Sequence, residues 1–458
     1  MSTYEIIFHL LVIANSVIAI IIALKILRQK WTPGGTIAWI LTIFFIPFLG
    51  VILYFIFGGR KTRIIANKKS EIFLDKLNVI PDEKANQFDK LLRAYDIPGA
   101  VSGNKINICE NGEIAYNQLI NLITAAEKSI FLLTFILAED ETGKEVVNRL
   151  VEKAGKGVSV YVLLDGLGSM HTRYEFLKPL IAAGGKFAFF NPVLKSPFHG
   201  RANLRNHRKM LITDEKNVMA GGTNIAVEYI GPNPQADRWK DLAFVLEGPA
   251  VKHYASVFVS DWKYVTGENI ELSEKQIEQA GESVIQIVPS GPDVPGDPMY
   301  DFILTAAFSA KKSLWIVTPY FVPDEPLAQA LTLCAHRGID LRIIVPEKSN
   351  HRLTDLARET YLRDIQKSGG KIYLYNKMVH AKTLIIDDNV VSIGSANMDM
   401  RSLFLNYEIS MLSYTPEDVL KTKNWIETLI NNSKRGVKNV SEFRNTLEGI
   451  VRMLAPLL

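Results

Sequence analysis

Two parts of the chain carry the same eight-residue pattern, and this duplication constrains the fold more than any other feature. HRKMLITD begins at His207 and HAKTLIID begins at His380, so each copy reads His-x-Lys-x-x-x-x-Asp. A glycine-containing segment follows each copy, and Asn224 and Asn397 both lie seventeen residues after their histidine. A single match of this kind is a chance event on the order of a few per cent, because short motifs carry a false-positive risk. Two copies with one common offset indicate a duplicated unit.

The segments around the two motifs repeat as well. Residues 123–137 (ITAAEKSIFLLTFIL) are similar to residues 304–322 (LTAAFSAKKSLWIVTPYFV), and each reads as a helix with small residues, a Lys-Ser turn and an apolar strand. Helices that alternate with nearly continuous apolar strands are typical of an α/β sheet with parallel or mixed pairing. We therefore expect two similar α/β halves, related by a pseudo-twofold axis that brings the motifs together.

Composition divides the chain further. A polar stretch, GENIELSEKQIEQAGES, lies between Thr266 and the strand that starts near Ser283, and it separates the halves. The expected segments are a membrane hairpin at 1–59, a basic connector at 60–100, a first half at 101–275 and a second half at 276–458.

The motif residues suit the chemistry of a phosphate group. Side chains two apart on a strand point to the same face, so the histidine and lysine of each motif converge on one pocket. An imidazole, an ammonium and an asparagine amide supply a nucleophile or proton donor, a positive charge and a neutral donor. Two facing histidines can divide the work, since one attacks phosphorus while the other protonates the leaving alkoxide. We expect no metal or other cofactor, because neither histidine has a local third ligand and the adjacent lysines repel cations.

The first sixty residues predict a membrane hairpin. Residues 6–24 and 36–57 contain no formal charge over nineteen and twenty-two positions, close to the ~20 residues that a helix needs to cross a bilayer. A cleaved targeting peptide is disfavoured because Glu5 precedes the first span and a second span follows at once. Two alternatives stay open: a pair of buried core helices, and a shallow re-entrant hairpin, since Pro47 and Gly50 interrupt the second span.

Charge favours a cytoplasmic body. Three basic residues lie in the turn between the spans and five follow the second span: Lys25, Arg28 and Lys30 against Arg60, Lys61, Arg63, Lys68 and Lys69. The second cluster is either an ordinary flank of the span or a contact with anionic headgroups. The formal net charge of +4 is too small over 458 residues to indicate a nucleic-acid partner.

With these motifs the chain resembles the phospholipase D superfamily, whose HKD motif is HxKxxxxD with a downstream GGxN or GSxN. Within that superfamily it is most similar to the bacterial cardiolipin synthases. The supporting phrases are WTPGGTIAWIL, PFLGVILYFIFG, RNHRKMLITD, VPSGPD, YFVPDE, KIYLYNKMVHAKTLIIDD and GSANMDMRSLFLNYE. The resemblance implies a metal-independent transphosphatidylation, in which one phosphatidylglycerol passes its phosphatidyl group to a histidine and a second takes it, giving cardiolipin and glycerol.

The resemblance also implies residue roles. His207 is expected to be the nucleophile and His380 the general acid and then base. Four side chains are expected to hold the phosphoryl oxygens: Lys209, Lys382, Asn224 and Asn397. Ser395 joins the expected substrate-binding residues, because the first half has Gly222 at the corresponding step and the two sites should therefore differ.

Carboxylates complete the expected site. Glu408 lies twenty-eight residues after His380, where the family places an acid that orients a histidine ring, and Asp241 resembles its counterpart in the first half. Asp214 and Asp387 close the two motifs and are counted with the catalytic residues. For these two, capping of a hairpin turn is an equally good interpretation.

The expected partners are phosphatidylglycerol, as donor and acceptor, and the lipid bilayer. The expected location is the bacterial inner membrane, with a multi-pass anchor and a cytoplasmic body. A hydrolytic phospholipase D or another phosphatidyltransferase of the superfamily remains the alternative, because the same residues serve either with a different acceptor. Near-balanced charge argues against a nuclease, and complete motifs argue against a non-catalytic scaffold. The sequence leaves open whether the protein forms a homo-oligomer.

Two features outside the motifs complete the expectations. Residues 443–458 are amphipathic, with apolar residues near helical spacing, and we favour core packing over seating of the body on the membrane. Cys109 and Cys334 are expected to be buried as small hydrophobic residues.

Overall fold

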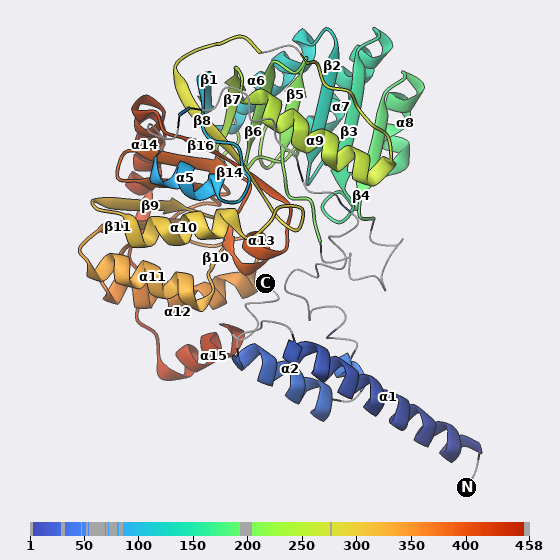
Figure 1. The fold of residues 1–458 in the computed structure, drawn as a ribbon. Helices are drawn as coiled ribbons and strands as arrows, with labels where there is room; N and C mark the ends of the chain where they lie inside the picture. The colour runs from blue at the N-terminus through green and yellow to red at the C-terminus, as the bar shows by residue number, and fades with distance from the viewer. Residues whose placement is uncertain are drawn as a thin grey trace.

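The computed structural model describes residues 3–28, 33–46, 48–51, 86–192, 204–274 and 277–452, with the single residues 54, 69, 72, 80 and 81. In this part of the chain a helix-covered sheet forms the body, and two N-terminal helices lie apart from it (Figure 1). The main sheet has 15 strands, and β10 (Phe321–Val322) and β15 (Met398–Asp399) pair separately.

The main sheet contains the same arrangement of strands twice. From the centre outward, the first half has the order β1-β7-β6-β5-β2-β3-β4 and the second has β8-β16-β14-β13-β9-β11-β12, followed by β17. The first-half strands are β1 (Val101–Cys109), β2 (Ser129–Thr134), β3 (Ser159–Asp165), β4 (Lys186–Phe190), β5 (Met210–Thr213), β6 (Asn217–Gly221) and β7 (Ala243–Glu247). The second-half strands are β8 (Ser283–Ser290), β9 (Ser313–Val317), β11 (Asp340–Pro346), β12 (Lys371–Tyr375), β13 (Thr383–Ile386), β14 (Val390–Gly394), β16 (Glu408–Ser413) and β17 (Ser433–Arg435). The expectation of two similar halves is confirmed.

Strand pairing explains how the halves join. In each half the outer strands are parallel, β2 to β3 to β4 and β9 to β11 to β12, while the inner strands are antiparallel. The central strands β1 and β8 pair antiparallel, with Val101 opposite Ile285, so the sheet continues from one half into the other. Mixed pairing agrees with the nearly continuous apolar runs of the outer strands.

Helices cover both faces of the sheet. Helices α9 (Val251–Thr266) and α14 (Pro416–Asn431) share one apolar core with strands of both halves. The opposite face is covered by two separate groups: α6 (Gly112–Ala125), α7 (Glu141–Gly155) and α8 (Tyr174–Ala182) in the first half, and α5 (Gln87–Arg93), α10 (Pro298–Ser309), α11 (Glu325–His336) and α12 (Arg352–Lys367) in the second. Aspartates cap the equivalent helices α7 and α11, since Asp140 accepts from the amide of Gly143 and Asp324 from that of Leu327.

Both cysteines belong to these cores. Cys109 packs with the first-half group and Cys334 with the second-half group. Burial raises the pKa of the Cys109 thiol to about 12 and that of Cys334 to about 11, so both thiols are protonated at neutral pH. The expectation of buried small hydrophobic residues is confirmed.

The N-terminal helices form a hairpin on one side of the body. Helix α1 (Thr3–Arg28) has 26 residues and a mean hydropathy of 2.7 over its most apolar window, of which 12% is buried. Most of its apolar side chains, among them Leu10 and Ile20, are exposed. Helix α2 (Pro33–Phe45) packs against it through Ile22, Ile26 and Ile43. Among the described residues α1 is the one helix long and apolar enough to cross a bilayer.

The second expected span, 36–57, is interrupted. Helix α2 ends at Phe45 after 13 residues, because a proline at 47 lacks an amide hydrogen and disfavours helical geometry in the residue before it. Phe48 follows with a φ of 64°, and its amide donates to Asn15 Oδ1 on α1 at 3.1 Å. Residues 47, 52, 53 and 55–57 of the expected span lie outside the described part of the chain.

Candidate active site

The two HKD motifs lie in extended segments that lead directly into the equivalent strands β5 and β13. Both segments pair with the opposite half of the protein. The His207 amide donates to the carbonyl of Tyr407 at 2.9 Å, and the His380 amide donates to that of Lys240 at 2.6 Å. Tyr407 and Lys240 directly precede Glu408 and Asp241, so each motif histidine lies close to an acid of the other half.

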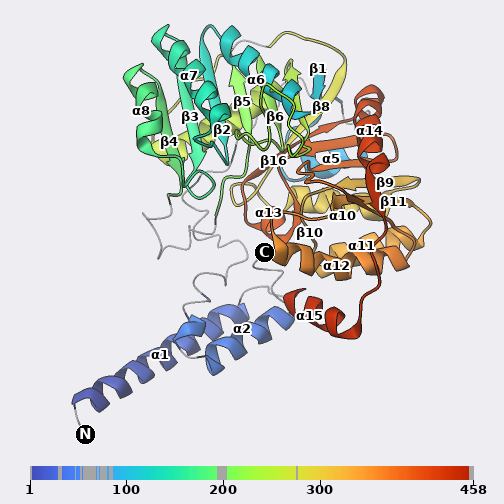
Figure 2. The ribbon, with the colours of Figure 1, turned by 180° about the vertical axis from the view of Figure 1, so that it is seen from behind.

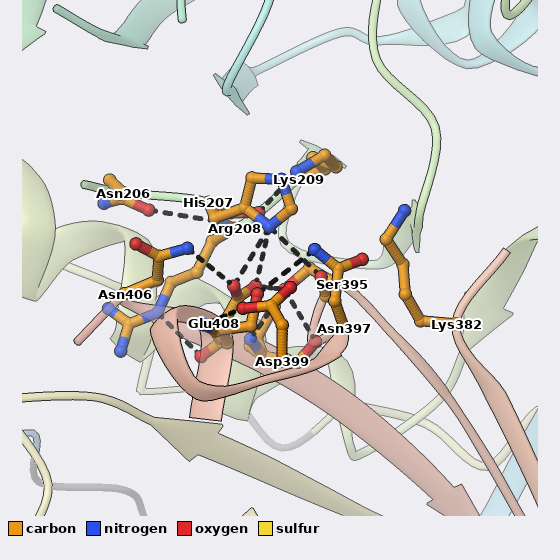
Figure 3. A network of polar contacts seen from close by, with 12 residues as sticks. Asn206, His207, Arg208, Lys209, Lys382, Ser395, Asn397, Asp399, Asn406 and Glu408 are labelled. Atoms are coloured by element: carbon orange, nitrogen blue, oxygen red, sulfur yellow. Dashed lines mark hydrogen bonds and ion pairs between the residues drawn. The ribbon is translucent and has the colours of Figure 1, made fainter. Parts of the chain in front are cut away.

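His207 is held by Glu408 (Figure 3). Its Nδ1 lies 3.0 Å from each carboxylate oxygen of Glu408 and 3.1 Å from the carbonyl oxygen of Ser395. The ring packs edge-on against Phe135, with centroids 4.9 Å apart. The carboxylate accepts a hydrogen bond from the Nδ1–H of the ring, so the lone pair of neutral His207 lies on Nε2.

His380 is held by Asp241. Its Nδ1 lies 2.7 Å from Asp241 Oδ2, and the ring packs against Tyr229 and Trp239 with centroids 5.0 and 5.7 Å away. The ammonium of Lys382 lies 2.7 Å from Nδ1 and 3.1 Å from Nε2 of the same ring. Lys382 thus contacts the ring of His380, whereas Lys209 donates to the backbone carbonyl of His207 at 2.6 Å.

The acids cross between the halves. The sequence places Glu408 after His380 and Asp241 after His207, yet Glu408 contacts His207 and Asp241 contacts His380. Spacing along the chain did not show this exchange, because it follows from the segment pairing across the centre of the sheet. Neither half holds a histidine together with its orienting carboxylate, so the site depends on both.

Burial sets the charges of the histidines. Burial, together with the nearby Lys209, lowers the pKa of His207 to about 4 against the opposing effect of Glu408. Burial and Lys382 lower the pKa of His380 to about 3. Both imidazoles are therefore neutral at physiological pH before substrate binds.

Burial and nearby charges also shift the pKa values of the lysines and acids of the site. Burial lowers the pKa of Lys209 to about 7 and that of Lys382 to about 8. Burial alone would raise the pKa of Glu408 and of Asp241, but the adjacent histidine and lysine charges lower both below the ordinary range. The pocket thus contains two carboxylates and two lysines whose charges depend on one another.

The asparagines line the same region. Asn224 and Asn397 are buried, and Oδ1 of Asn224 accepts from the amide of Ile136 at 3.3 Å. The amide nitrogen of Asn397 donates to Ser402 Oγ at 3.2 Å. Their expected role in substrate binding stays a prediction.

Ser395 and Gly222 differ in a way that the sequence did not reveal. The Ser395 hydroxyl donates to Glu408 Oε2 at 2.5 Å and accepts from the amide of Ile409 at 3.0 Å. A Cβ atom at Gly222 would collide with the carboxylate of Asp241. The Ser395 hydroxyl thus positions Glu408, and the glycine makes room for Asp241. The expected role of Ser395 in substrate binding stays a prediction.

Asp214 and Asp387 lie at the far ends of β5 and β13 from the histidines. The carboxylate of Asp214 accepts from the amides of residues 127–129 at 2.9, 2.6 and 2.9 Å. That of Asp387 accepts from the amides of residues 311–313 at 2.8, 2.7 and 2.9 Å. Seven residues at about 3.3 Å each separate either aspartate from its histidine. These contacts correct the catalytic assignment: both side chains cap the Lys-Ser turns.

A buried charge cluster behind His207 was not expected from the sequence. Arg208, which points away from His207 and Lys209, donates to Asp261 at 2.9 and 3.0 Å and to Asp293 at 3.0 Å. Its Nε also donates to the carbonyl of Glu408 at 3.1 Å (Figure 3). In the sequence, Arg208 lies in the phrase RNHRK and Asp293 in the phrase VPSGPD. Both phrases support the family resemblance, but neither indicates that the two side chains form an ion pair.

Lys69 completes this cluster. Its ammonium forms ion pairs with both Asp261 and Asp293 and lies 4.8 Å from the centre of the Tyr407 ring. The side chain is 1% exposed, so Lys69 is not part of a headgroup contact, as the basic cluster after the second span had suggested. The other four basic residues of that cluster lie outside the described residues. Lys69 is thereby fixed beside the first motif.

The sequence of this chain is similar to those of known proteins. A family model described as "Cardiolipin synthase, PLD-like domain" matches residues 119–262 and 303–430, and one described as "Phospholipase_D-nuclease N-terminal" matches residues 17–59. Cardiolipin synthase 1 of Bacillus anthracis is 33% identical over 95% of this chain and 92% of its own length. The major cardiolipin synthase of Bacillus subtilis is 34% identical over 93% of this chain and 92% of its own length.

A solved structure supports the fold. The crystal structure of phosphatidylserine synthase from Haemophilus influenzae matches with a TM-score of 0.58, covering 81% of this chain and 98% of that one. At 16% identity this likeness bears on the architecture alone.

Proposed function

The chain belongs to the phospholipase D-like family of cardiolipin synthases, and on that premise we propose that it joins two phosphatidylglycerol molecules into cardiolipin and glycerol. Phosphatidyl transfer between membrane phospholipids follows from the family. Phosphatidylglycerol as both donor and acceptor is our proposal, as is the division into a hairpin (1–59), a connector (60–100) and two catalytic halves (101–275 and 276–458).

In the first step, Nε2 of His207 attacks the phosphorus of the donor lipid. The P–O bond to the terminal glycerol breaks, and His380 gives its proton to the departing alkoxide, so that glycerol leaves and a phosphatidyl-histidine remains. Glu408 stabilises the cationic His207 ring through Nδ1, 3.0 Å away. Lys209 and Lys382, with Asn224 and Asn397, stabilise the charge on the phosphoryl oxygens.

In the second step, His380 acts as a base. It takes the proton from a glycerol hydroxyl of the second phosphatidylglycerol, whose oxygen attacks phosphorus as the P–N bond to His207 breaks. Cardiolipin leaves, and the enzyme returns to its starting state. His380 must carry a proton when the donor is bound; the negative phosphodiester offsets the charges of Lys209 and Lys382, and this raises the pKa of His380 above its value in the empty pocket.

The crossed carboxylate–histidine contacts carry the proposal. Glu408 with His207 and Asp241 with His380 give two rings with equivalent Nδ1 partners, which suits a mechanism that divides the work between a nucleophile and an acid–base. The side chains of His207 and His380 are 10% and 5% exposed, respectively. This burial supports an alcohol acceptor delivered by a bound lipid rather than bulk water.

The experiment follows purified enzyme in mixed micelles that contain phosphatidylglycerol as the sole phospholipid. Cardiolipin, free glycerol and phosphatidic acid are measured together, and the His207→Ala variant is the control. The proposal predicts cardiolipin and glycerol in equal amounts. Phosphatidic acid without cardiolipin would instead identify a hydrolase, and cardiolipin formed only after another lipid is added would identify a different donor.

The family and the apolar helix α1 associate the protein with the membrane. We further propose a multi-pass hairpin in the bacterial inner membrane with a cytoplasmic body. Even without the buried Lys69, four basic residues follow the hairpin and three lie in its turn. A cysteine introduced at Lys156, whose side chain is 63% exposed on the body, tests the orientation with an impermeant maleimide. The expected result is labelling in inverted but not right-side-out vesicles; the reverse would place the body outside.

A further inference from the structure

Helix α15 (Glu442–Arg452) presents an apolar face to solvent. Phe443, Leu447 and Ile450 are 82%, 44% and 56% exposed. Residues three and four apart share one side of a helix, so these three side chains form a continuous stripe. The core packing favoured from the sequence is therefore wrong for this face, although Val451 on another side of the helix is buried.

The opposite face of α15 is fixed to the body. Glu448 is buried and forms an ion pair with Arg363 of α12, and Arg444 donates to its other oxygen at 2.9 Å. Arg363 also donates to Asn445 at 3.2 Å. A buried carboxylate is costly unless paired, so these contacts determine which way the helix faces. The outward direction of the apolar stripe is a built feature of the fold.

A basic groove adjoins the same helix. The groove has a volume of about 870 Å³, and Arg444 of α15 lines it together with residues of β12 and β17. Six basic side chains and two carboxylates line it: Lys348, Lys371, Lys434, Arg435, Lys438 and Arg444, with Glu347 and Glu359. Lys434 pairs with Glu347, Lys371 with Asp340 and Arg444 with Glu448. Lys348, Arg435 and Lys438 add further positive charge to the groove. Positive charge is thus concentrated beside the apolar stripe.

The position of α15 indicates what its apolar stripe contacts. Helix α15 lies on the side of the body that faces the apolar helices α1 and α2 (Figure 2). An amphipathic helix with basic neighbours binds at the boundary between headgroups and acyl chains, where anionic lipids attract it. Both features of the surface, apolar insertion and positive charge, complement an anionic bilayer.

We propose that α15 and the basic groove form a second membrane contact that lays the body on an anionic bilayer. The stripe of Phe443, Leu447 and Ile450 enters the headgroup boundary, and the basic side chains of the groove bind lipid phosphates. The inference rests on the proposed function in that the substrates are anionic lipids of the same bilayer. In this proposal, helix α15 at the end of the second half helps to hold the active site at the membrane surface.

Fluorescence of the full chain in nanodiscs tests the contact. An environment-sensitive dye is attached to Leu447→Cys, since the native cysteines are buried. The expected result is a blue-shifted emission in discs that contain phosphatidylglycerol and a smaller shift in discs of phosphatidylcholine. Emission typical of water in both discs would overturn the proposal. A blue shift in lipid-free detergent that grows with protein concentration would also overturn it, because a second copy would then cover the stripe.

Kinetics in vesicles supplies the second test. The triple variant Phe443→Ser, Leu447→Ser, Ile450→Ser should raise the KM for vesicle lipid by about tenfold or more, the change expected from losing a buried Leu-sized side chain, with kcat unchanged. Leu420→Ser is the matched control, because Leu420 is 57% exposed on α14, away from α1 and α2 (Figure 1). A triple variant that behaves like Leu420→Ser would refute the contact. If the proposed function fails instead, the turnover is absent while the lipid-dependent emission shift remains.

Arg435→Glu with Lys438→Glu tests the charges of the groove. This variant should lose the difference in emission between the two kinds of disc while it keeps the apolar part of the shift. An unchanged preference for phosphatidylglycerol would contradict the assignment of the groove.

Discussion

Replacement of Glu408 by glutamine tests the role of the crossed acids. Glutamine has nearly the same shape, but its amide can donate a hydrogen bond to His207 Nδ1, and the ring proton then moves to Nε2. The attacking lone pair is lost, and no negative charge stabilises the phosphatidyl-histidine cation. The equivalent change in a Ser-His-Asp triad lowers kcat by about 10⁴, and we expect a loss of about 10³ to 10⁴, or about 4 to 5.5 kcal/mol of barrier.

The structure supports a large effect because Glu408 is fully buried and has few ways to rearrange. Both of its oxygens lie 3.0 Å from Nδ1, and Ser395 and Asn406 donate to them at 2.5 and 3.3 Å. The assay is cardiolipin formation at saturating phosphatidylglycerol, with circular dichroism to verify folding. Ser395→Ala is the graded comparison, since losing one hydrogen bond of about 1 kcal/mol predicts a roughly fivefold loss. A Glu408→Gln variant within tenfold of wild type would refute the reasoning.

Three further predictions follow from the charges of the site and its surroundings. The alkaline limb of kcat/KM should fall near pH 7 as Lys209, with its pKa lowered to about 7 by burial, loses its proton; Lys209→Arg should move that limb upward, and a pH profile of both proteins checks it. Lys69→Met leaves one buried aspartate charge uncompensated and should cost about 3 to 5 kcal/mol in urea unfolding, and adding Asp293→Asn should recover most of it; no recovery would exclude charge balance as the cause. Asp214→Asn should cost about 1 to 3 kcal/mol of stability through its three amide contacts with kcat unchanged, and a large loss of kcat would restore its catalytic assignment.

The duplicated motif made much of this architecture predictable. A histidine, a lysine and an asparagine at one offset in two similar segments require two similar units, and alternation along an extended segment places His207 and Lys209 on one side. Apolar strands between helices indicated a mixed α/β sheet for the same local reason. These inferences depend on neighbouring residues, and the structure confirms the two halves.

Most of the contacts that the sequence did not show join residues far apart in the chain. Glu408 reaches His207 because β1 pairs with β8 and because the Tyr407 carbonyl binds the His207 amide, and no local pattern encodes either pairing. Asp214 caps a turn that lies 85 residues earlier in the chain. Lys69 looked like a flank of the membrane span because its partners, Asp261 and Asp293, lie 192 and 224 residues away.

Trapping of the covalent intermediate tests the central claim, that His207 carries the phosphatidyl group while His380 moves the proton. The His380→Ala variant is incubated with a phosphatidyl ester of p-nitrophenol, a leaving group that needs no general acid, and the protein is digested and analysed by mass spectrometry. The account predicts a phosphatidyl adduct on His207, which persists because the base for the second step is missing, and no adduct in His207→Ala. An adduct on His380 in His207→Ala, or none on His207 when nitrophenol is released, would contradict it.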